Sequence, residues 1–289
     1  MRQLRNFSAG RAALAATTAA VALVIGLGTA SASPVPTTFT WTPSAIGLTG
    51  GTISNATGYS VNDYASVNTD ATGNFTEQGA LNIINFTNAS GNAVASSGLG
   101  STYSLYLLFA GTGNQGGPIP APGTTVTGTY STLDFSLFAT PTVPNFAVNS
   151  TGVTVSNNAG AQVIATGSII PGPGNTVSLQ NAGGLFTPKA DIVVSFDPCL
   201  STAQSSSQGT CAGNESAFFT APTGQMQVAI GDFSATTSRT TVSGSNLQIA
   251  GGGGNITQDV NVPEPASMLL LGSGLIMVGL MRRKYYPKA

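Results

Sequence analysis

The sequence predicts an all-β protein, with a single β-sandwich or jelly-roll-like domain between two short apolar segments at the chain ends. Three observations support this class. Short segments alternate apolar and polar residues and end at Gly, Pro, Asn or Ser. No window of 11 residues sustains a helical period. The polar positions carry Ser, Thr, Asn and Gln, and charged residues make up only 7% of the chain.

Nine segments follow this period-two pattern. In the clearest of them, Tyr103, Leu105, Leu107 and Phe109 fall on one face. The predicted strands are residues 59–65, 80–86, 102–109, 132–138, 152–155, 162–164, 191–196, 225–230 and 246–249. A loosely ordered Thr- and Gly-rich stalk is the alternative, with residues 90–100 and 111–125 as its flexible stretches.

The charges are distributed unevenly. Between residues 33 and 281, Lys189 and Arg239 are the two basic residues and face ten acidic ones, a formal charge of −8. The near-neutral total is therefore produced by cationic chain ends, a pattern typical of export or membrane topology. The chain has no histidine, which excludes His-dependent nucleophiles and His-ligated metals. The scarcity of basic residues argues against nucleic acid as a partner.

The N-terminal segment, residues 1–32, has the pattern of a signal peptide. Arg2, Arg5 and Arg11 precede the uninterrupted apolar run 19–28. Ala30 and Ala32 then supply the small residues of a cleavage site. We expect the protein to be exported; an uncleaved anchor is the alternative.

The C-terminal segment has three parts in a fixed order. A Pro-Glu-Pro tripeptide comes first, then sixteen uncharged residues (266–281) that would make a helix roughly 24 Å long. A basic cluster follows and favours a cytoplasmic C-terminus by the positive-inside rule. The residues of the tripeptide and the cluster are Pro263, Glu264, Pro265, Arg282, Arg283 and Lys284.

This tail resembles the PEP-CTERM sorting signal of Gram-negative bacteria. The resemblance implies recognition by exosortase, a membrane enzyme that cleaves near the PEP motif and passes the protein to the cell surface. It also implies transient anchoring in the inner membrane through the helix 266–281. A plain tail anchor is the alternative. The implied organisation is a signal peptide (1–32), an all-β extracellular domain (33–250), a Gly-rich linker (251–262) and the sorting signal (263–289).

Two cysteines, Cys199 and Cys211, bracket a loop rich in Ser and Gln. In an exported protein this spacing predicts a disulfide, with two free thiols as the alternative. Without histidine, two cysteines cannot complete a zinc site, and no metal is expected.

Two glycine-containing motifs invite a ligand interpretation. Residues 111–116 match G-x-G-x-x-G, but Gly117 and Pro118 follow where a dinucleotide site needs a helix, so we interpret the match as a loop. Residues 68–73 resemble the start of a calcium loop without its closing acid, which favours a turn. Weak surface calcium binding by Asp70 and Glu77 is the alternative. No cofactor is expected.

The body is similar to the flocculation-associated PEP-CTERM proteins. Residues 39–45, 61–85, 106–113 with 128–137, and 215–254 carry this resemblance. It implies a non-enzymatic surface or matrix protein that acts with exopolysaccharide in cell aggregation, flocculation or biofilm formation. Candidate aromatics for stacking on sugars, which would otherwise belong to the core, are Trp41, Tyr59, Tyr64, Tyr103, Tyr106 and Tyr130.

Two other functions stay open at this stage. One is a carbohydrate-active hydrolase that uses a pair of carboxylates, for which Glu77 and Glu215 are the first candidates. The other is a passive surface coat or spacer protein.

Overall fold

Residues 35–36, 38–199, 205–211, 219–221, 228–235 and 239–260 are described by the structure, a computed structural model. All of them belong to one unit, Val35–Val260. Several predictions lie outside the described residues: the signal peptide with Ala30 and Ala32, the helix 266–281, and the sorting residues Pro263, Glu264, Pro265, Arg282, Arg283 and Lys284.

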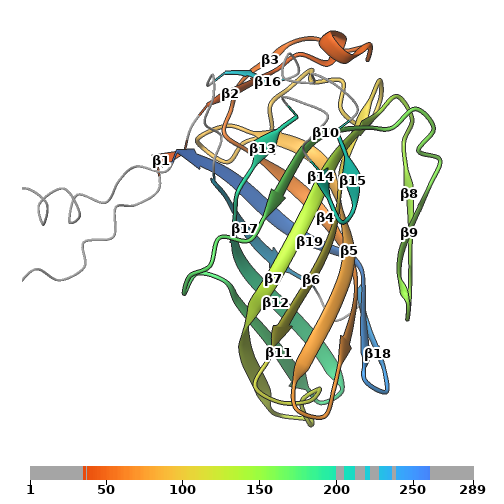
Figure 1. Cartoon of the computed structure of the whole chain (residues 1–289), viewed down its shortest axis with the longest axis vertical. Helices are drawn as coiled ribbons and strands as arrows, with labels where there is room; N and C mark the ends of the chain where they lie inside the picture. Colours follow the sequence, from red (N-terminus) through yellow and green to blue (C-terminus); the bar gives the residue numbers. More distant parts are fainter. Residues whose placement is uncertain are drawn as a thin grey trace, which may run out of the picture. The chain divides into compact units, whose positions relative to one another are not determined.

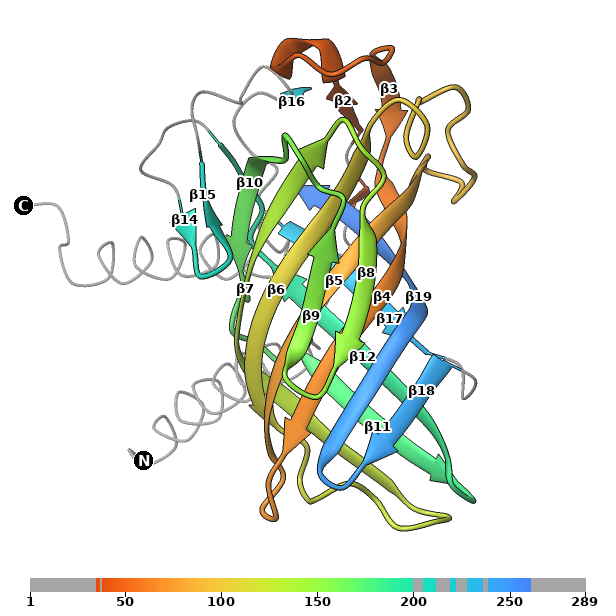
Figure 2. The same cartoon turned by 90° about the vertical axis from the view of Figure 1, so that its right-hand side faces the viewer.

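Eight long strands pair side by side, and the last pairs with the first, so the sheet closes into a barrel-like wall (Figures 1 and 2). Every neighbouring pair in this ring is antiparallel. In ring order the strands are β11 (Thr176–Ala182), β12 (Leu185–Val194), β17 (Val228–Ser234), β19 (Asn246–Val260), β4 (Gly58–Thr69), β5 (Asn74–Thr87), β6 (Ser104–Asn114) and β7 (Thr125–Thr140).

Strand β7 closes the ring because it changes partner along its length. Residues 125–129 pair with β11, whereas residues 134–139 pair with β10 (Gln162–Ser168), which in turn pairs with β13 (Asp197–Pro198). The all-β class is confirmed, but the structure shows a closed sheet where we predicted a sandwich. Alternating strands bury one face in either architecture, so the pattern alone does not distinguish them.

Three short strands lie at one end of the closed sheet (Figure 1). They are β2 (Phe39–Trp41), β3 (Ile53–Ala56) and β16 (Phe219–Ala221), and the 3-10 helix η1 (Pro43–Ile46) connects the first two. Trp41 packs against Phe39, Tyr59 and Phe86 with ring centroids 5.0–5.6 Å apart. These rings form an apolar plug for this end.

A hairpin covers part of the outer face. Strands β8 (Asn145–Asn149) and β9 (Gly152–Ser156) pair with each other and lie over β4 to β6 (Figure 2). Phe146 of β8 stacks on Tyr64 with centroids 4.8 Å apart and meets the edge of Tyr106 at 6.0 Å. The hairpin is therefore held by aromatic contacts outside the closed sheet.

The predicted disulfide between Cys199 and Cys211 is confirmed. Both cysteines are buried with Val163, and Phe138 packs against them. The loop that they close contains the small hairpin β14 (Ser205–Ser206) and β15 (Gly209–Thr210). The Ser136 and Ser206 hydroxyls lie 2.7 Å apart, which joins this hairpin to β7.

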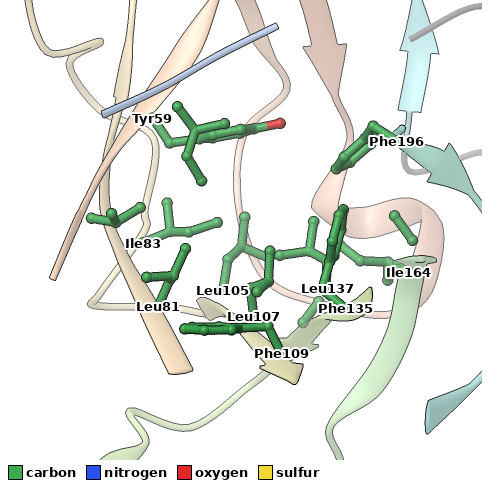
Figure 3. Packing of buried hydrophobic residues seen from close by; sticks show 14 of the residues in the cluster. Tyr59, Leu81, Ile83, Leu105, Leu107, Phe109, Phe135, Leu137, Ile164 and Phe196 are labelled. Carbon is green, nitrogen blue, oxygen red and sulfur yellow. The ribbon is translucent and has the colours of Figure 1, made fainter. Parts of the chain in front are cut away.

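Two apolar clusters fill the closed sheet. The larger one contains inward side chains of β4, β5, β6 and β7 and extends to the plug; Figure 3 shows Leu81, Ile83, Leu107, Phe109 and Phe135 pointing toward one another. The second cluster consists of Val67, Phe75, Leu179 and Leu247.

Glycines on the inner face make room for the rings of neighbouring strands. Gly79 is paired with Phe109, and Gly113 with Phe75. A methyl group built on either glycine would overlap the partner's ring. The rings therefore lie directly against bare backbone, the arrangement by which an aromatic side chain covers a glycine in a sheet.

The predicted Gly-rich linker is wrong over residues 251–260, which belong to β19. Residues 252–254 pair with β4 on one side, and 253–254 pair with β17 on the other. Gly251, with φ +93°, lies at the irregularity between Ala250 and Gly252. Two short strands flank β19 along its length: β18 (Thr240–Ser243) and β1 (Val35–Pro36).

We predict that Gly79→Ala destabilises the domain by about 1–3 kcal/mol or more, because the added methyl group overpacks against Phe109. The matched control is Gly253→Ala, at an exposed position of β19 with no atom within 4 Å of the added methyl group. Urea unfolding midpoints measure both changes. Equal midpoints for the two variants would show that ring-on-glycine packing does not constrain the closed sheet.

Candidate functional site

A few polar side chains lie inside the closed sheet. Asp63 of β4, Glu77 of β5 and Tyr130 of β7 line two adjoining cavities of about 60 Å³ each. Gln115, just after β6, also lines the second cavity. The first cavity is otherwise walled by the larger apolar cluster. The second is walled by members of both clusters and by Ser178, Lys189 and Ser234. We call Asp63, Glu77, Gln115 and Tyr130 the interior polar layer.

Glycines face both acids on the neighbouring strands. Asp63 is paired with Gly252 of β19, and Glu77 with Gly111 of β6. Glycine has no side chain, so neither carboxyl group is covered by the residue paired with it on that neighbouring strand. A methyl group on Gly111 would lie 3.4 Å from the ring of Tyr130, which shows that this ring lies over β6 at the glycine.

An extra residue in β7 directs Tyr130 inward. Thr132 pairs with Thr112 and Tyr130 with Gly113, so Ser131 is the additional residue of a bulge. The bulge lets both Tyr130 and Leu133 face the interior. The hydroxyl of Tyr130 donates a hydrogen bond to Glu77 Oε2 across β6.

The interior polar layer lacks a positive charge. Asp63 and Glu77 are each only 7% exposed. The two described basic residues, Lys189 and Arg239, are exposed, although Lys189 also lines the second cavity. Burial raises the pKa of Glu77 to about 7, although the bond from Tyr130 opposes the shift. Burial, and then the charge of Glu77, raise the pKa of Asp63 well above its ordinary value.

Two polar atoms of the layer have no hydrogen-bond partner among the described residues: Asp63 Oδ1 and Gln115 Nε2. Buried polar atoms are ordinarily paired, so each marks a position where a water molecule or a ligand group would be stabilised.

The outer face carries a second candidate site. Two open depressions, of about 640 and 430 Å³, share Asn68, Thr76 and Thr112. We call them together the outer groove. Thr151, from the tip of the β8–β9 hairpin, lines the smaller depression. The other polar side chains of the groove come from β4 to β7 and the adjoining turns: Ser66, Thr69, Asp70, Asn74, Gln78, Ser131, Thr132, Asp134 and Ser245.

Hydroxyls and amides in the outer groove already form short networks. The Thr112 and Thr132 hydroxyls lie 2.7 Å apart. Asn74 of the groove accepts a bond at its Oδ1 from Nδ2 of Asn114, which is not itself a lining residue, at 2.8 Å. No basic side chain is among the groove's described lining residues. The groove therefore offers neutral donors and acceptors to a ligand.

The six aromatics predicted to contact sugars are mostly core residues. Trp41, Tyr59, Tyr103 and Tyr106 are each at most 2% exposed. Tyr64 is half-buried under Phe146, and Tyr130 points into the closed sheet. The hairpin and the plug cover rings that the sequence pattern alone would leave on the surface.

Both glycine motifs lack the ligand geometry. Asp70 accepts bonds from the backbone amides of Thr72 and Asn74 at 2.8 and 2.9 Å, which confirms the predicted turn. Bonds from the Thr72 and Asn74 side chains, then from their amides, lower the pKa of Asp70 to about 2. Glu77 is buried, and its carboxyl group accepts a bond from Tyr130 inside the closed sheet, which contradicts the alternative of a surface calcium site with Asp70. The predicted loop 111–116 is wrong in part, because residues 111–114 belong to β6.

The hydrolase hypothesis meets a constraint at Glu77. This carboxyl lies in cavities of about 60 Å³, too small for a sugar ring, while Glu215 lies outside the described residues. Sequence reasoning missed Asp63 as its neighbour. The signal was present in the period-two pattern. Glu77 falls on the same strand face as Phe75 and Leu81, and Asp63 falls on the same face as Val61, so each acid interrupts a face that is otherwise apolar.

Neither a metal cluster nor a membrane helix was found in the part of the chain that the structure describes. Among the described residues, no group of three or more Asp, Glu and Cys side chains could hold a metal ion. No helix there is long and apolar enough to span a membrane.

Comparison with known proteins identifies the C-terminal segment. Residues 261–284 match the model of the PEP-CTERM protein-sorting motif, which confirms the predicted tail. The match includes all six predicted sorting residues and indicates exosortase-dependent sorting to the cell surface of a Gram-negative bacterium. No curated protein and no solved structure matches the chain.

We predict that the folded domain loses stability as the pH rises from about 4.5 to 7. In this window the unfolded chain releases the Glu77 proton, whereas the folded domain retains it because its pKa is about 7. The loss amounts to about 3 kcal/mol above pH 7. Asp63 acts in the same direction. Glu77→Gln keeps an acceptor for Tyr130 and should raise the urea midpoint at pH 8 but not at pH 4.5.

Asp191→Asn, at an exposed position of β12, is the control and should leave the pH profile of the midpoint unchanged. A Glu77→Gln profile parallel to that of the wild type would contradict the assignment of the pH dependence to the interior.

Proposed function

We propose that the exported domain acts with exopolysaccharide at the cell surface or in the extracellular matrix, in cell aggregation, flocculation or biofilm formation. The sorting motif supports the location. The outer groove is the observation that carries the binding role, because hydroxyl and amide side chains line it and offer hydrogen bonds to sugar hydroxyls. The proposed role is binding, and it assigns the domain no catalytic residue.

The chemistry of the groove favours a neutral polysaccharide. Its described lining has no Lys or Arg, and carboxylates of Asp70 and Asp134 lie at its borders. An anionic polymer would be repelled by these acids and would find no cation to pair with. Since the candidate aromatics are covered, recognition would depend on hydrogen bonds in place of ring stacking.

The proposal further holds that exosortase removes the segment after the PEP motif. We expect the intact mass of the surface protein to lack residues 266–289. Replacing Pro263, Glu264 and Pro265 together with Ala should leave the tail attached. The control Asp191→Ala, in the body of the domain, should lose the tail as the wild type does. A surface protein that retains the tail in the wild type would contradict this processing step.

We predict that Thr112→Val with Thr132→Val weakens exopolysaccharide binding about tenfold, because two hydrogen-bonding groups are lost. The two hydroxyls bond to each other and are exposed, so replacing both leaves neither of them unpaired in the folded domain. Binding of purified exopolysaccharide is measured on the exported protein, and settling of cells is scored in a deletion strain complemented with each variant.

Thr176→Val with Thr187→Val, on β11 and β12, is the matched control and should keep both binding and settling. Unchanged settling after deletion of the gene would overturn the role in aggregation. Equal binding by the two double variants would remove the groove as the site.

A further inference from the structure

We propose that the interior polar layer is a binding site for a short-chain primary alkylammonium ion. The ammonium group would lie against Asp63 and Glu77, and its alkyl chain would occupy the apolar part of the cavities. Glu77 also lines the smaller depression of the outer groove, but its carboxyl group accepts the bond from Tyr130 inside the closed sheet. Binding at this site does not depend on the proposed role with exopolysaccharide.

Charge balance is the first reason. Two carboxyl groups line the same interior space. Lys189 also lines the second cavity, but it is exposed, and no basic residue is among the causes that set the pKa of Asp63 or Glu77. Ionisation of both carboxyl groups in this interior space leaves negative charge uncompensated in a region of low dielectric constant. A monovalent cation with several N–H donors would reduce this charge and satisfy carboxylate oxygens together.

An unsatisfied atom is the second and independent reason. Asp63 Oδ1 is buried and unpaired within the described structure, and its residue lines both cavities. Tyr130, by contrast, already donates to Glu77. An ammonium group has three donors and no acceptor, which matches one free carboxylate oxygen beside a carboxylate that is partly occupied.

The shape of the space sets the size of the ligand. Leu107, Phe135 and Ile192 are among the apolar side chains that line the first cavity. Each cavity, at about 60 Å³, is well below the roughly 150 Å³ that accommodates a benzene molecule. A compact ring would have to fit in one cavity alone, whereas an unbranched chain of a few carbons can extend from one adjoining cavity into the other.

The test is calorimetric titration of the full-length chain at pH 8 with n-butylammonium chloride, methylammonium chloride and n-butanol. We expect saturable binding of butylammonium at least tenfold tighter than that of methylammonium or butanol. Asp63→Asn, which keeps the shape of the side chain, should weaken butylammonium at least tenfold. Asp191→Asn, an identical change on the outer face, should not.

Near-ultraviolet circular dichroism confirms that each variant is folded, and Glu77→Gln provides a second interior variant with the same expected loss. Butanol binding as tightly as butylammonium would overturn the role of the carboxyl groups. Absence of saturable butylammonium binding to the folded wild type would show that the cavities hold water only. Unchanged polysaccharide binding by Asp63→Asn would separate this result from the outer groove.

Discussion

Contact between aromatic rings and bare glycine backbone is the constraint on which this closed sheet depends. Eight strands enclose a narrow interior, and bulky side chains at every inward position would not fit. Gly79 and Gly113 each accept the ring of the residue paired with them, Phe109 and Phe75. Gly167 of β10 accepts Phe135 of β7 in the same way, where β7 pairs with β6 on one side and with β10 in place of β11 on the other. Large rings thus pack without widening the wall.

Glycines at inward positions also make the interior polar layer possible. Gly111 lets Tyr130 cross β6 to Glu77, and Gly252 leaves Asp63 without a side chain opposite it. At some inward positions the paired residue is a glycine that receives an aromatic ring, and at others the paired glycine faces a carboxyl-bearing residue. The acids occupy the second kind of position, which is why the domain contains both a dense apolar core and a small polar interior.

Local pattern was sufficient to locate the strands and the inward face of β7, because Leu133, Phe135 and Leu137 alternate with Asp134 and Ser136. All nine predicted segments overlap strands. Closure was not predictable, since it rests on pairing residues 125–129 with 176–180, two short segments far apart in sequence. The burial of Tyr64 and Tyr106 depends likewise on Phe146, from a hairpin that packs on the outside. Such long-range contacts leave no period in the sequence.

Strand β19 has a mechanical consequence. It is hydrogen-bonded to β17 and β4 along most of its length, and its last residue, Val260, is paired with Val35 at the start of the domain. A pull on the C-terminal side enters the domain along the axis of this strand. The load then shears two ladders of hydrogen bonds at once, whereas a peeling force would break them one after another. A surface protein tethered by its C-terminal side would transmit tension between cell and matrix through its most extensively paired strand.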